Sequence, residues 1–469
     1  MNNHYDIIII GAGPAGMSAS CLASKYKVKI LVLDVAISPG GQIFRAVETN
    51  QSSHKQKFGA NYLNGIKLVN KFRKCSIDYQ SRAKVWHLSE NGEVHYLKDN
   101  KTHFVKAKHI LITTGAQERP FPVTGWTLNR VMTAGAAQIL LKESNLGIQN
   151  AVFVGTGPLL YLIAHQYLMM GIPIKAVIDT TPLSNYFRAI PKIVGIRGNF
   201  NEIYKGIKWI GDIKKSNTFF INRISDLRIL GDEEVNAIEY QKNGQWNKIE
   251  CEHVLLHQGL VPEINISLSV GCRKIWNQQQ ACWNIDVDKW FQSSLPCISV
   301  AGDASSISGA VAAEASGKIA ALNILAKLNI ITAKNRDQLA IPIQKSLKTE
   351  MSIRTFLETL FNPISRFRIP NNNDTIVCRC EEVLAGEIRE SVDLGSKGPN
   401  QTKSFTRCGM GPCQGRLCGL TVAEIIADQL NCSIEEVGYY RIRPPVTPIT
   451  LGELSTTKMT TPEKQANQL

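Results

Sequence analysis

The sequence lacks an uninterrupted apolar run of the eighteen or more residues that a membrane-spanning helix needs. It also lacks a basic N-terminal segment followed by an apolar stretch and a cleavage site, the pattern of a secretory signal. We therefore expect a cytoplasmic chain without a transmembrane segment. Its 469 residues fit roughly three domains of about 100 to 200 residues each.

Acidic side chains are scarce relative to basic ones, 39 against 53, which gives a formal net charge of +14. Such a balance permits binding to nucleic acid or to an anionic membrane. The charge is dispersed, however, so we expect no nucleic-acid partner. The densest basic stretch is interleaved with apolar residues, which indicates either a solvated face or a surface that docks on a partner subunit or peripherally on a membrane. Its members are Arg188, Lys192, Arg197, Lys205, Lys208, Lys214 and Lys215.

No C-x2-C or C-x4-C pair occurs before residue 378. This absence excludes the redox disulfide with which some flavoenzymes reduce thiol substrates. Twelve cysteines are present, but five lie within residues 378–418 and the others show no pairing pattern, which suits a reducing compartment. Four of the others are most simply small buried apolar side chains, namely Cys251, Cys272, Cys282 and Cys297.

A dinucleotide-binding pattern opens the chain. Residues 5–10 (YDIIII) have the composition of a parallel strand buried on both faces, and the turn GAGPAG and a helical pattern follow at once. The three glycines permit a tight turn, close approach of a pyrophosphate, and close helix packing. The next strand, residues 29–33, ends in an acid that can bind ribose hydroxyls. The predicted contacts are Gly11, Gly13, Pro14, Ala15, Gly16 and Asp34.

A second unit of the same kind begins at residue 151. Its strand leads into Gly155 and Gly157, an apolar helix and a strand that ends at Asp179, but Leu160 replaces the third glycine. The unit therefore holds either a bound nucleotide or an empty structural copy of the site. Asp179, if it meets a ribose, favours NAD or another adenine nucleotide without a 2′-phosphate. His257 is expected to be a satisfied loop histidine rather than a residue that faces a nicotinamide.

Three later segments carry a first resemblance. They are GGQ at residues 40–42, TGA at residues 114–116, and GD at residues 302–303 before a helix of small residues. In this order they resemble two-dinucleotide flavoproteins of the glutathione-reductase type, which implies an α/β fold that binds FAD. By that resemblance Asp303 would bind the ribityl chain, and the helix after it would direct its dipole at the flavin. The implied contacts are Gly41, Gln42, Thr114, Gly115, Gly302 and Asp303.

Four cysteines near the C-terminus form a C-x-C pair, a gap of thirty-two residues, and a C-x4-C pair. They are Cys378, Cys380, Cys413 and Cys418. Thiolates held in close pairs bind a soft metal centre, and an iron-sulfur cluster is favoured, with a structural zinc as the alternative. Cys408 also forms a C-x4-C pair with Cys413, so spacing alone does not choose between Cys408 and Cys418. Helical patterns near residues 384–394 and 421–430 flank the pairs.

These cysteine segments carry a second resemblance. Residues 377–383 (VCRCEEV) and 406–419 resemble the 2Fe-2S domain of the bacterioferritin-associated-ferredoxin type, an α-rich domain. The resemblance implies that Cys378, Cys380, Cys413 and Cys418 are the cluster ligands, and that nearby arginines stabilise the charge of the cluster.

Residues 5 to about 453 together resemble the alpha subunits of bacterial amino-acid and opine dehydrogenases, the group that includes opine oxidase, hydrogen cyanide synthase and D-hydroxyproline dehydrogenase. The resemblance implies a partner (beta) flavoprotein that oxidises a C–N bond, in some complexes a small ferredoxin-like subunit, and a quinone or similar electron acceptor. The chain itself would pass electrons through FAD and a 2Fe-2S cluster. An NADH-dependent flavin and iron-sulfur reductase, or a flavoprotein with a zinc-held interaction module, are the alternatives. No catalytic residue is assigned.

The predicted domain division follows from these motifs. A discontinuous FAD-binding domain covers residues 1–145 and 285–330, with the second nucleotide-binding domain, residues 146–284, inserted into it. A polar, proline-containing linker follows at 331–372, then the 2Fe-2S domain at 373–440 and a tail at 441–469.

Overall fold

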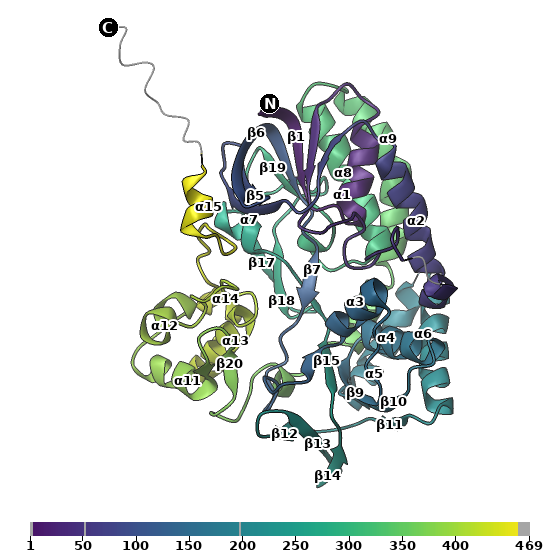
Figure 1. Ribbon diagram of the computed structural model, residues 1–469, viewed down its shortest axis with the longest axis vertical. Coiled ribbons are helices and arrows are strands. Elements are labelled where there is room, and N and C mark those ends of the chain that lie inside the picture. Colours follow the sequence, from purple (N-terminus) through teal and green to yellow (C-terminus); the bar gives the residue numbers. More distant parts are fainter. Residues whose placement is uncertain (1–2, 51–52, 197, 458–469) are drawn as a thin grey trace.

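The computed structural model describes residues 3–50, 53–196 and 198–457. It shows two α/β lobes stacked on one another and a small helical domain beside them (Figure 1). No helix among the described residues is long and apolar enough to cross a membrane. Arg197 of the basic stretch and residues 458–469 of the predicted tail lie outside the described residues.

The first lobe is built on a sheet that has seven strands within the described residues, in the order β3-β2-β1-β6-β5-β4 with β19 also paired to β6. Its strands are β1 (His4–Ile10), β2 (Ile30–Leu33), β3 (Asp78–Gln80), β4 (Lys84–Leu88), β5 (Glu93–Lys98), β6 (Lys101–Ile112) and β19 (Ile298–Val300). The run of isoleucines in β1 forms a central strand because both of its faces are covered, and its last four residues are at most 5% exposed. The parallel strands β1, β2, β6 and β19 end at one edge, where the predicted FAD contacts follow.

Helices cover the first sheet. They are η1 (Ser53–Phe58), α1 (Pro14–Ala23), α2 (Ala60–Arg73), η3 (Gly302–Ala304), α8 (Ala310–Lys327) and α9 (Ala333–Met351). The segment predicted as a linker is mostly helical, because α9 packs on α8 and is followed by α10 (Arg354–Leu360) and η4 (Ser365–Phe367). Pro342 lies inside α9, and a proline there indicates a break when only the sequence is considered. The helix continues through this proline because Ala340, Ile343 and Leu347 make apolar contacts with the first lobe that stabilise it.

The second lobe contains a parallel sheet whose strand order among the described residues is β11-β10-β9-β15-β8. Its strands are β8 (Val131–Thr133), β9 (Ala151–Thr156), β10 (Ile174–Asp179), β11 (Phe219–Ile221) and β15 (Val254–Gln258). Its helices are α3 (Ala134–Ser144), α4 (Pro158–Met169), α5 (Leu183–Ala189), η2 (Ile190–Gly195) and α6 (Phe200–Lys215). An antiparallel sheet of β12 (Asp226–Gly231), β13 (Val235–Lys242) and β14 (Gln245–Glu250) extends from this lobe.

Some segments belong to a different lobe from the one that the predicted domain boundaries gave them. Strand β8 and helix α3 come from the range predicted for the first domain but belong to the second lobe. The hairpin of β17 (Lys274–Asn277) and β18 (Cys282–Ile285) comes from the range predicted for the second, but it packs in the core of the first. The chain crosses between lobes at the antiparallel pair of β7 (Ala116–Glu118) and β16 (Leu260–Pro262). The sequence gives little indication of this crossing, because both strands are short and no glycine turn marks them.

The helical domain contains the cysteine pairs. Its elements are β20 (Ile376–Cys378), β21 (Val383–Leu384), α11 (Ala385–Asp393), α12 (Pro399–Thr406), α13 (Gly419–Leu430) and α14 (Ile434–Val437). The helices predicted near residues 384–394 and 421–430 are present as α11 and α13, and α12 is additional. The chain then returns to the first lobe, where α15 (Leu451–Ser455) lies beside β6.

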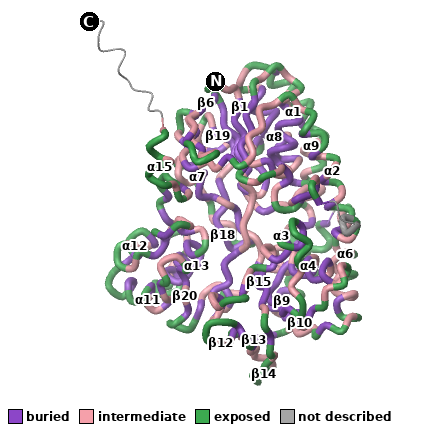
Figure 2. Tube along the Cα trace, viewed as in Figure 1, coloured by how far each residue is buried: buried purple, intermediate pink, exposed green. Residues whose placement is uncertain are grey.

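The helical domain shares one hydrophobic core with the first lobe. Val377, Ile425 and Val446 belong to the same buried cluster as Ile112 of β6 and Ile285 of β18. The helix α7 (Asn265–Ser269) contributes Ile266 to it. Figure 2 shows buried chain running from the first sheet into the helical domain. The domain is therefore packed onto the first lobe and is not a separately tethered module.

Candidate functional site

The first glycine turn joins β1 to α1. A Cβ on Gly11, whose φ is +107°, would lie 2.4 Å from the carbonyl oxygen of Thr113, and a Cβ on Gly16 would lie 1.9 Å from that of Gly11. The fold therefore requires glycine at both positions. A Cβ on Gly13 would meet nothing closer than the Cα of Gly41, at 3.8 Å. Gly13 is thus not required by packing, and its predicted role of admitting a pyrophosphate, with Pro14 and Ala15 beside it, stays a prediction.

Asp34 holds this turn in place from the end of β2. Its Oδ2 accepts a hydrogen bond from the backbone N–H of Ala12 at 2.5 Å, and its Oδ1 accepts one from Ala36 at 2.6 Å. The residue is 8% exposed, and burial raises the pKa of its carboxyl against the opposing effect of these hydrogen bonds. The carboxylate is therefore fixed beside the turn, in a place that fits its predicted contact with a ribose.

A buried lysine supports the loop at residues 40–43, which carries predicted FAD contacts. Gly41 lies against Gly13, and the next two residues, Gln42 and Ile43, use their carbonyl oxygens to accept hydrogen bonds from Nζ of Lys142 at 3.3 and 3.0 Å. Lys142 belongs to α3, so an amino group from the second lobe positions this loop of the first lobe. Sequence reasoning missed it because a lysine near the end of a helix is usually exposed. Burial lowers its pKa to about 7.

Replacing Lys142 with methionine should change how stability depends on pH. The pKa of Lys142 falls from 10.5 to about 7 on folding, so between these pH values the unfolded chain carries a proton that the folded chain has lost. The free energy of unfolding therefore gains a contribution that rises with pH from about 7 to about 10, and Lys142→Met removes it. Urea unfolding midpoints at several pH values in this window measure the difference. The exposed Lys25→Met is the control, and an unchanged slope in Lys142→Met would contradict the assignment.

The two predicted strand-end segments lie at the carboxyl edge of the first sheet, where dinucleotides bind in such folds. After β6, Thr114 donates to the carbonyl oxygen of Glu263 at 3.2 Å, and Gly115 accepts from the N–H of Glu263 at 3.0 Å. After β19 and Gly302, Oδ1 of Asp303 accepts from the N–H of Gly309 at 3.0 Å, immediately before α8. These bonds fix both segments. Their predicted contacts with FAD remain predictions.

The second glycine turn faces a buried histidine. A Cβ on Gly155 would lie 1.6 Å from the carbonyl oxygen of His257, and one on Gly157 would lie 3.3 Å from its Nε2. His257 lies within β15 and not in the loop that we expected. Its Nδ1 is 2.7 Å from Oε1 of Glu118, so it is satisfied, as expected. Sequence reasoning did not find Glu118, because β7 lies about 140 residues earlier in the chain.

Asp179 of the second unit is nearly inaccessible. It is 2% exposed, and its Oδ1 accepts a hydrogen bond from the N–H of Thr181 at 2.8 Å. Burial raises the pKa of its carboxyl. Leu160 is fully buried in α4, where a glycine would have left space. This geometry does not decide between a bound nucleotide and an empty copy of the site.

Five cysteines gather in the helical domain. The sulfur atoms of Cys378, Cys408 and Cys418 all lie within 4.8 Å of one another and are buried. The thiol of Cys380 hydrogen-bonds with that of Cys413, and both are partly exposed. The structure thus forms a buried group of three thiols that includes Cys408 and, beside it, the pair of Cys380 and Cys413, and it does not choose between Cys408 and Cys418 as a ligand. Cys251, Cys272 and Cys282 are buried as expected, whereas Cys297 is only partly buried.

This thiol set fits a thiolate-ligated metal centre. Hydrogen bonds from the neighbouring thiols and from the backbone N–H groups of Gly409 and Glu381 lower the pKa of Cys378, and the same hydrogen bonds to Cys378 raise the pKa values of Cys408 and Cys418. A Cβ on Gly411 would lie 2.3 Å from the Cβ of Cys380, so glycine lets the two segments approach. Such N–H groups around sulfur are typical of iron-sulfur sites.

The arginines expected to stabilise a cluster have other partners. Arg407 donates to Glu381 at 3.0 Å, Arg379 lies over the ring of Trp126 and Arg416 donates to Glu263 at 2.8 Å. The contact of Arg416 with Glu263 joins the loop that holds Cys413 and Cys418, called the cysteine loop below, to the first lobe. Glu263 is the residue that also bonds to Thr114 and Gly115.

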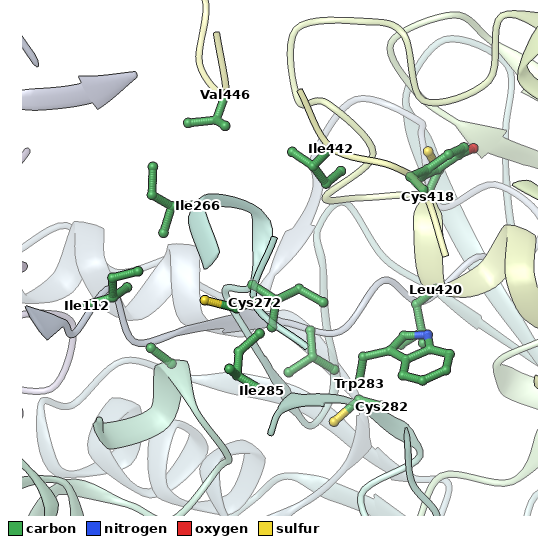
Figure 3. Close-up of a cluster of buried hydrophobic side chains, with 14 of the residues drawn as sticks. Ile112, Ile266, Cys272, Cys282, Trp283, Ile285, Cys418, Leu420, Ile442 and Val446 are labelled. Carbon is green, nitrogen blue, oxygen red and sulfur yellow. The ribbon is translucent and has the colours of Figure 1, made fainter. Parts of the chain in front are cut away.

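Two further hydrogen bonds join the cysteine loop to the first lobe. Gln117 donates to the carbonyl oxygen of Arg416 at 2.8 Å, and Asn265 donates to that of Gln414 at 2.9 Å. Figure 3 shows the apolar part of this contact, where Leu420 lies beside Trp283 of the first lobe and Cys418 lies above Leu420 in this view. The loop that holds Cys413 and Cys418 therefore rests on the strand ends that carry predicted flavin contacts.

Residues 5–170 match the family described as Pyridine nucleotide-disulphide oxidoreductase, and residues 373–458 match the sarcosine oxidase A3 domain. The chain is 39% identical to an opine oxidase protein of Rhizobium meliloti, the A component of that enzyme, over 97% of this chain and 88% of that protein. It is 27% identical to the HcnB component of hydrogen cyanide synthase from Pseudomonas aeruginosa, over 94% of this chain and 96% of that protein. The solved structure of L-proline dehydrogenase from P. horikoshii has a TM-score of 0.72 at 17% identity, over 96% of this chain and 79% of that one.

These similarities confirm the predicted fold, a two-dinucleotide α/β architecture shared with thioredoxin reductase of T. acidophilum at a TM-score of 0.52. They also confirm a flavin-dependent oxidoreductase whose fold supports FAD and pyridine-nucleotide binding. Three opine oxidase A subunits are between 36% and 39% identical to this chain over nearly its full length. The chain therefore belongs to the family of opine oxidase A subunits.

Proposed function

We propose that this chain is the FAD- and 2Fe-2S-containing electron-transfer subunit of a heteromeric dehydrogenase that acts on opines or related secondary amines and imino acids. A flavin accepts two electrons from a donor, and a 2Fe-2S cluster passes electrons one at a time. The residues of this chain would hold both groups at a fixed separation, with Gly13, Asp34 and Asp303 toward FAD and the cysteine loop toward the cluster.

One observation carries this proposal: the cysteine loop is hydrogen-bonded to the carboxyl edge of the first sheet. Arg416 bonds to Glu263, and Glu263 bonds to Thr114 and Gly115, which are predicted flavin contacts. A zinc-held interaction module would have no need for this position. The core shared by the helical domain and the first lobe holds the cysteine loop against that lobe, which supports a role in electron transfer.

The substrate class and the partners are inferred from the relatives. The relatives are named as subunits of opine oxidase, hydrogen cyanide synthase and sarcosine oxidase, so this chain would also work with a second flavoprotein subunit that oxidises the C–N bond. A small ferredoxin-like subunit would complete some assemblies, and a quinone or similar acceptor would receive the electrons. We also propose a cytoplasmic location, which the cysteine usage supports.

Anaerobic reduction tests the proposal. Reconstituted chain with its co-purified partner should lose the 450 nm region of flavin absorption when an opine or imino acid is added, and the chain alone with NADH should not. Rapid bleaching of the chain alone by NADH would instead establish an NADH-dependent reductase that uses the second glycine turn.

The variant Arg416→Ala should slow reduction of the metal centre more than reduction of the flavin. Arg407→Ala is the matched control, because among the described residues this exposed arginine forms its ion pair with Glu381 of the same helical domain.

A further inference from the structure

The second lobe exposes an unusual number of large apolar side chains on α5, η2 and α6. Val194 is 91% exposed, Tyr204 is 68% exposed and Phe187 is 66% exposed. The other members of this apolar surface are Leu183, Tyr186, Ile190, Ile193, Phe200 and Ile207. Single exposed apolar residues are common, but a concentration of them marks an interaction site. Helix α6 lies at the outer edge of the lobe (Figures 1 and 2).

Helix α6 carries apolar side chains on two of its sides. Ile213 is buried, and Trp209 and Ile210 pack against the core of the lobe, so these residues account for folding. Phe200, Tyr204 and Ile207 recur at positions i, i+4 and i+7 and are all more than half exposed. Residues with this spacing share one face of a helix. The second stripe therefore has no partner among the described residues and does not contribute to folding.

A small core supports the two parts of the surface. Ala189 and Ile196, at the ends of α5 and η2, pack with Ile353 and Phe356, and Ile203 of α6 packs against the same cluster. The segment from 183 to 215 is thus anchored beneath while its outer apolar side chains remain exposed. A partner would meet an ordered surface.

Basic residues border this apolar surface. The segment 183–215 contains seven basic and two acidic residues. Glu202 pairs with Lys205 at 2.6 Å, and Asp212 lies 3.1 Å from His165, so neither acid neutralises the other lysines. On α6, Lys208 and Lys215 lie within about 80° of the exposed stripe around the helix axis, and so at its border. The surface therefore presents apolar side chains within a positive rim.

We propose that this surface docks the protein on a membrane rich in anionic lipids. Interfacial helices combine lysine or arginine with exposed aromatic and aliphatic side chains, and lysines near the surface attract acidic headgroups. Lysine is depleted in interfaces between proteins, so the lysines of this rim favour a membrane as the occupant. The inference rests on the surface alone and does not depend on the proposed reaction.

Vesicle flotation tests the inference with the full chain loaded with its cofactors. The chain should float with phosphatidylcholine vesicles that contain phosphatidylglycerol, should float little with phosphatidylcholine alone, and should be released by high salt. Lys192→Gln and Lys208→Gln should each lower partitioning about fivefold. The combined variant Phe187→Ser, Val194→Ser and Ile207→Ser should lower it roughly tenfold or more. The matched control is Leu394→Ser with Phe405→Ser, whose side chains are exposed to a similar degree on the helical domain.

Three results would overturn the inference. They are no flotation with either lipid, equal flotation with both lipids, and unchanged flotation of the combined apolar variant. If that variant instead loses a co-purifying protein while its vesicle binding stays intact, the surface is an interface between proteins, and the membrane proposal fails. Because flotation requires no turnover, failure of this inference would leave the proposed electron-transfer function untouched.

Discussion

Replacing Cys378 or Cys418 with serine should remove the metal centre while leaving FAD bound. Both thiols are fully enclosed in the group of three that the structure brings together, so each loss leaves an incomplete ligand set. We expect the unchanged chain to contain two irons and two acid-labile sulfides, and each variant to retain roughly a tenth or less. Iron, sulfide and FAD analyses of the same samples, with circular dichroism to verify folding, measure this.

The remaining cysteines provide internal controls. Cys432 lies in the same domain just after α13 but outside the thiol group, so Cys432→Ser should keep its iron. Cys418→Ser should lose iron and Cys408→Ser should keep it if the resemblance has assigned the ligands correctly. The reverse pattern would assign Cys408 in place of Cys418. One zinc per chain without sulfide would exclude the cluster altogether.

Gly13→Ala should weaken FAD binding without harming the fold. Gly13 has φ of −77°, which alanine adopts readily, and an added Cβ would have no contact shorter than 3.8 Å. The methyl group would instead fill space that the predicted pyrophosphate needs. At a cost of about 1 to 3 kcal/mol for such crowding, FAD affinity should fall roughly tenfold to hundredfold. Reconstitution of the FAD-free chain, followed by flavin fluorescence, measures the affinity.

Two other glycines separate binding from packing. Gly16→Ala should reduce folded yield itself, because the new Cβ would lie 1.9 Å from a backbone oxygen. Gly206→Ala in α6, where a Cβ meets nothing within 4 Å, should leave both fold and FAD unchanged. If Gly13→Ala retains full FAD affinity, the pyrophosphate lies elsewhere.

The sequence predicts the elements that have strong local patterns. The strand, glycine turn and acid of each nucleotide unit are present as β1, α1, β2 and β9, α4, β10, because apolar runs and glycines determine these geometries locally. The cysteine segments also meet in the folded chain, but the buried group of three thiols contains Cys408, which the predicted ligand set leaves out. Local pattern was also sufficient for α11 and α13, which have a periodic apolar face.

What the sequence does not predict depends on contacts between distant segments. Lys142 is recognisable as a support for the FAD loop only when α3 is placed against residues 42 and 43. The pairs Glu118 with His257 and Glu263 with Arg416 join residues more than 130 positions apart. Helix α9 forms despite Pro342 because its apolar contacts with the first lobe outweigh the local preference.

The shared core of the helical domain and the flavin lobe has a consequence for how the protein matures. Val377 and Val446 fill the same interior as Ile112, so that interior is complete only after the C-terminal hundred or so residues have been made. A nascent chain could form the first glycine turn early but would leave an apolar gap beneath its sheet. Folding of the helical domain would then be a late step that also completes the core of the first lobe.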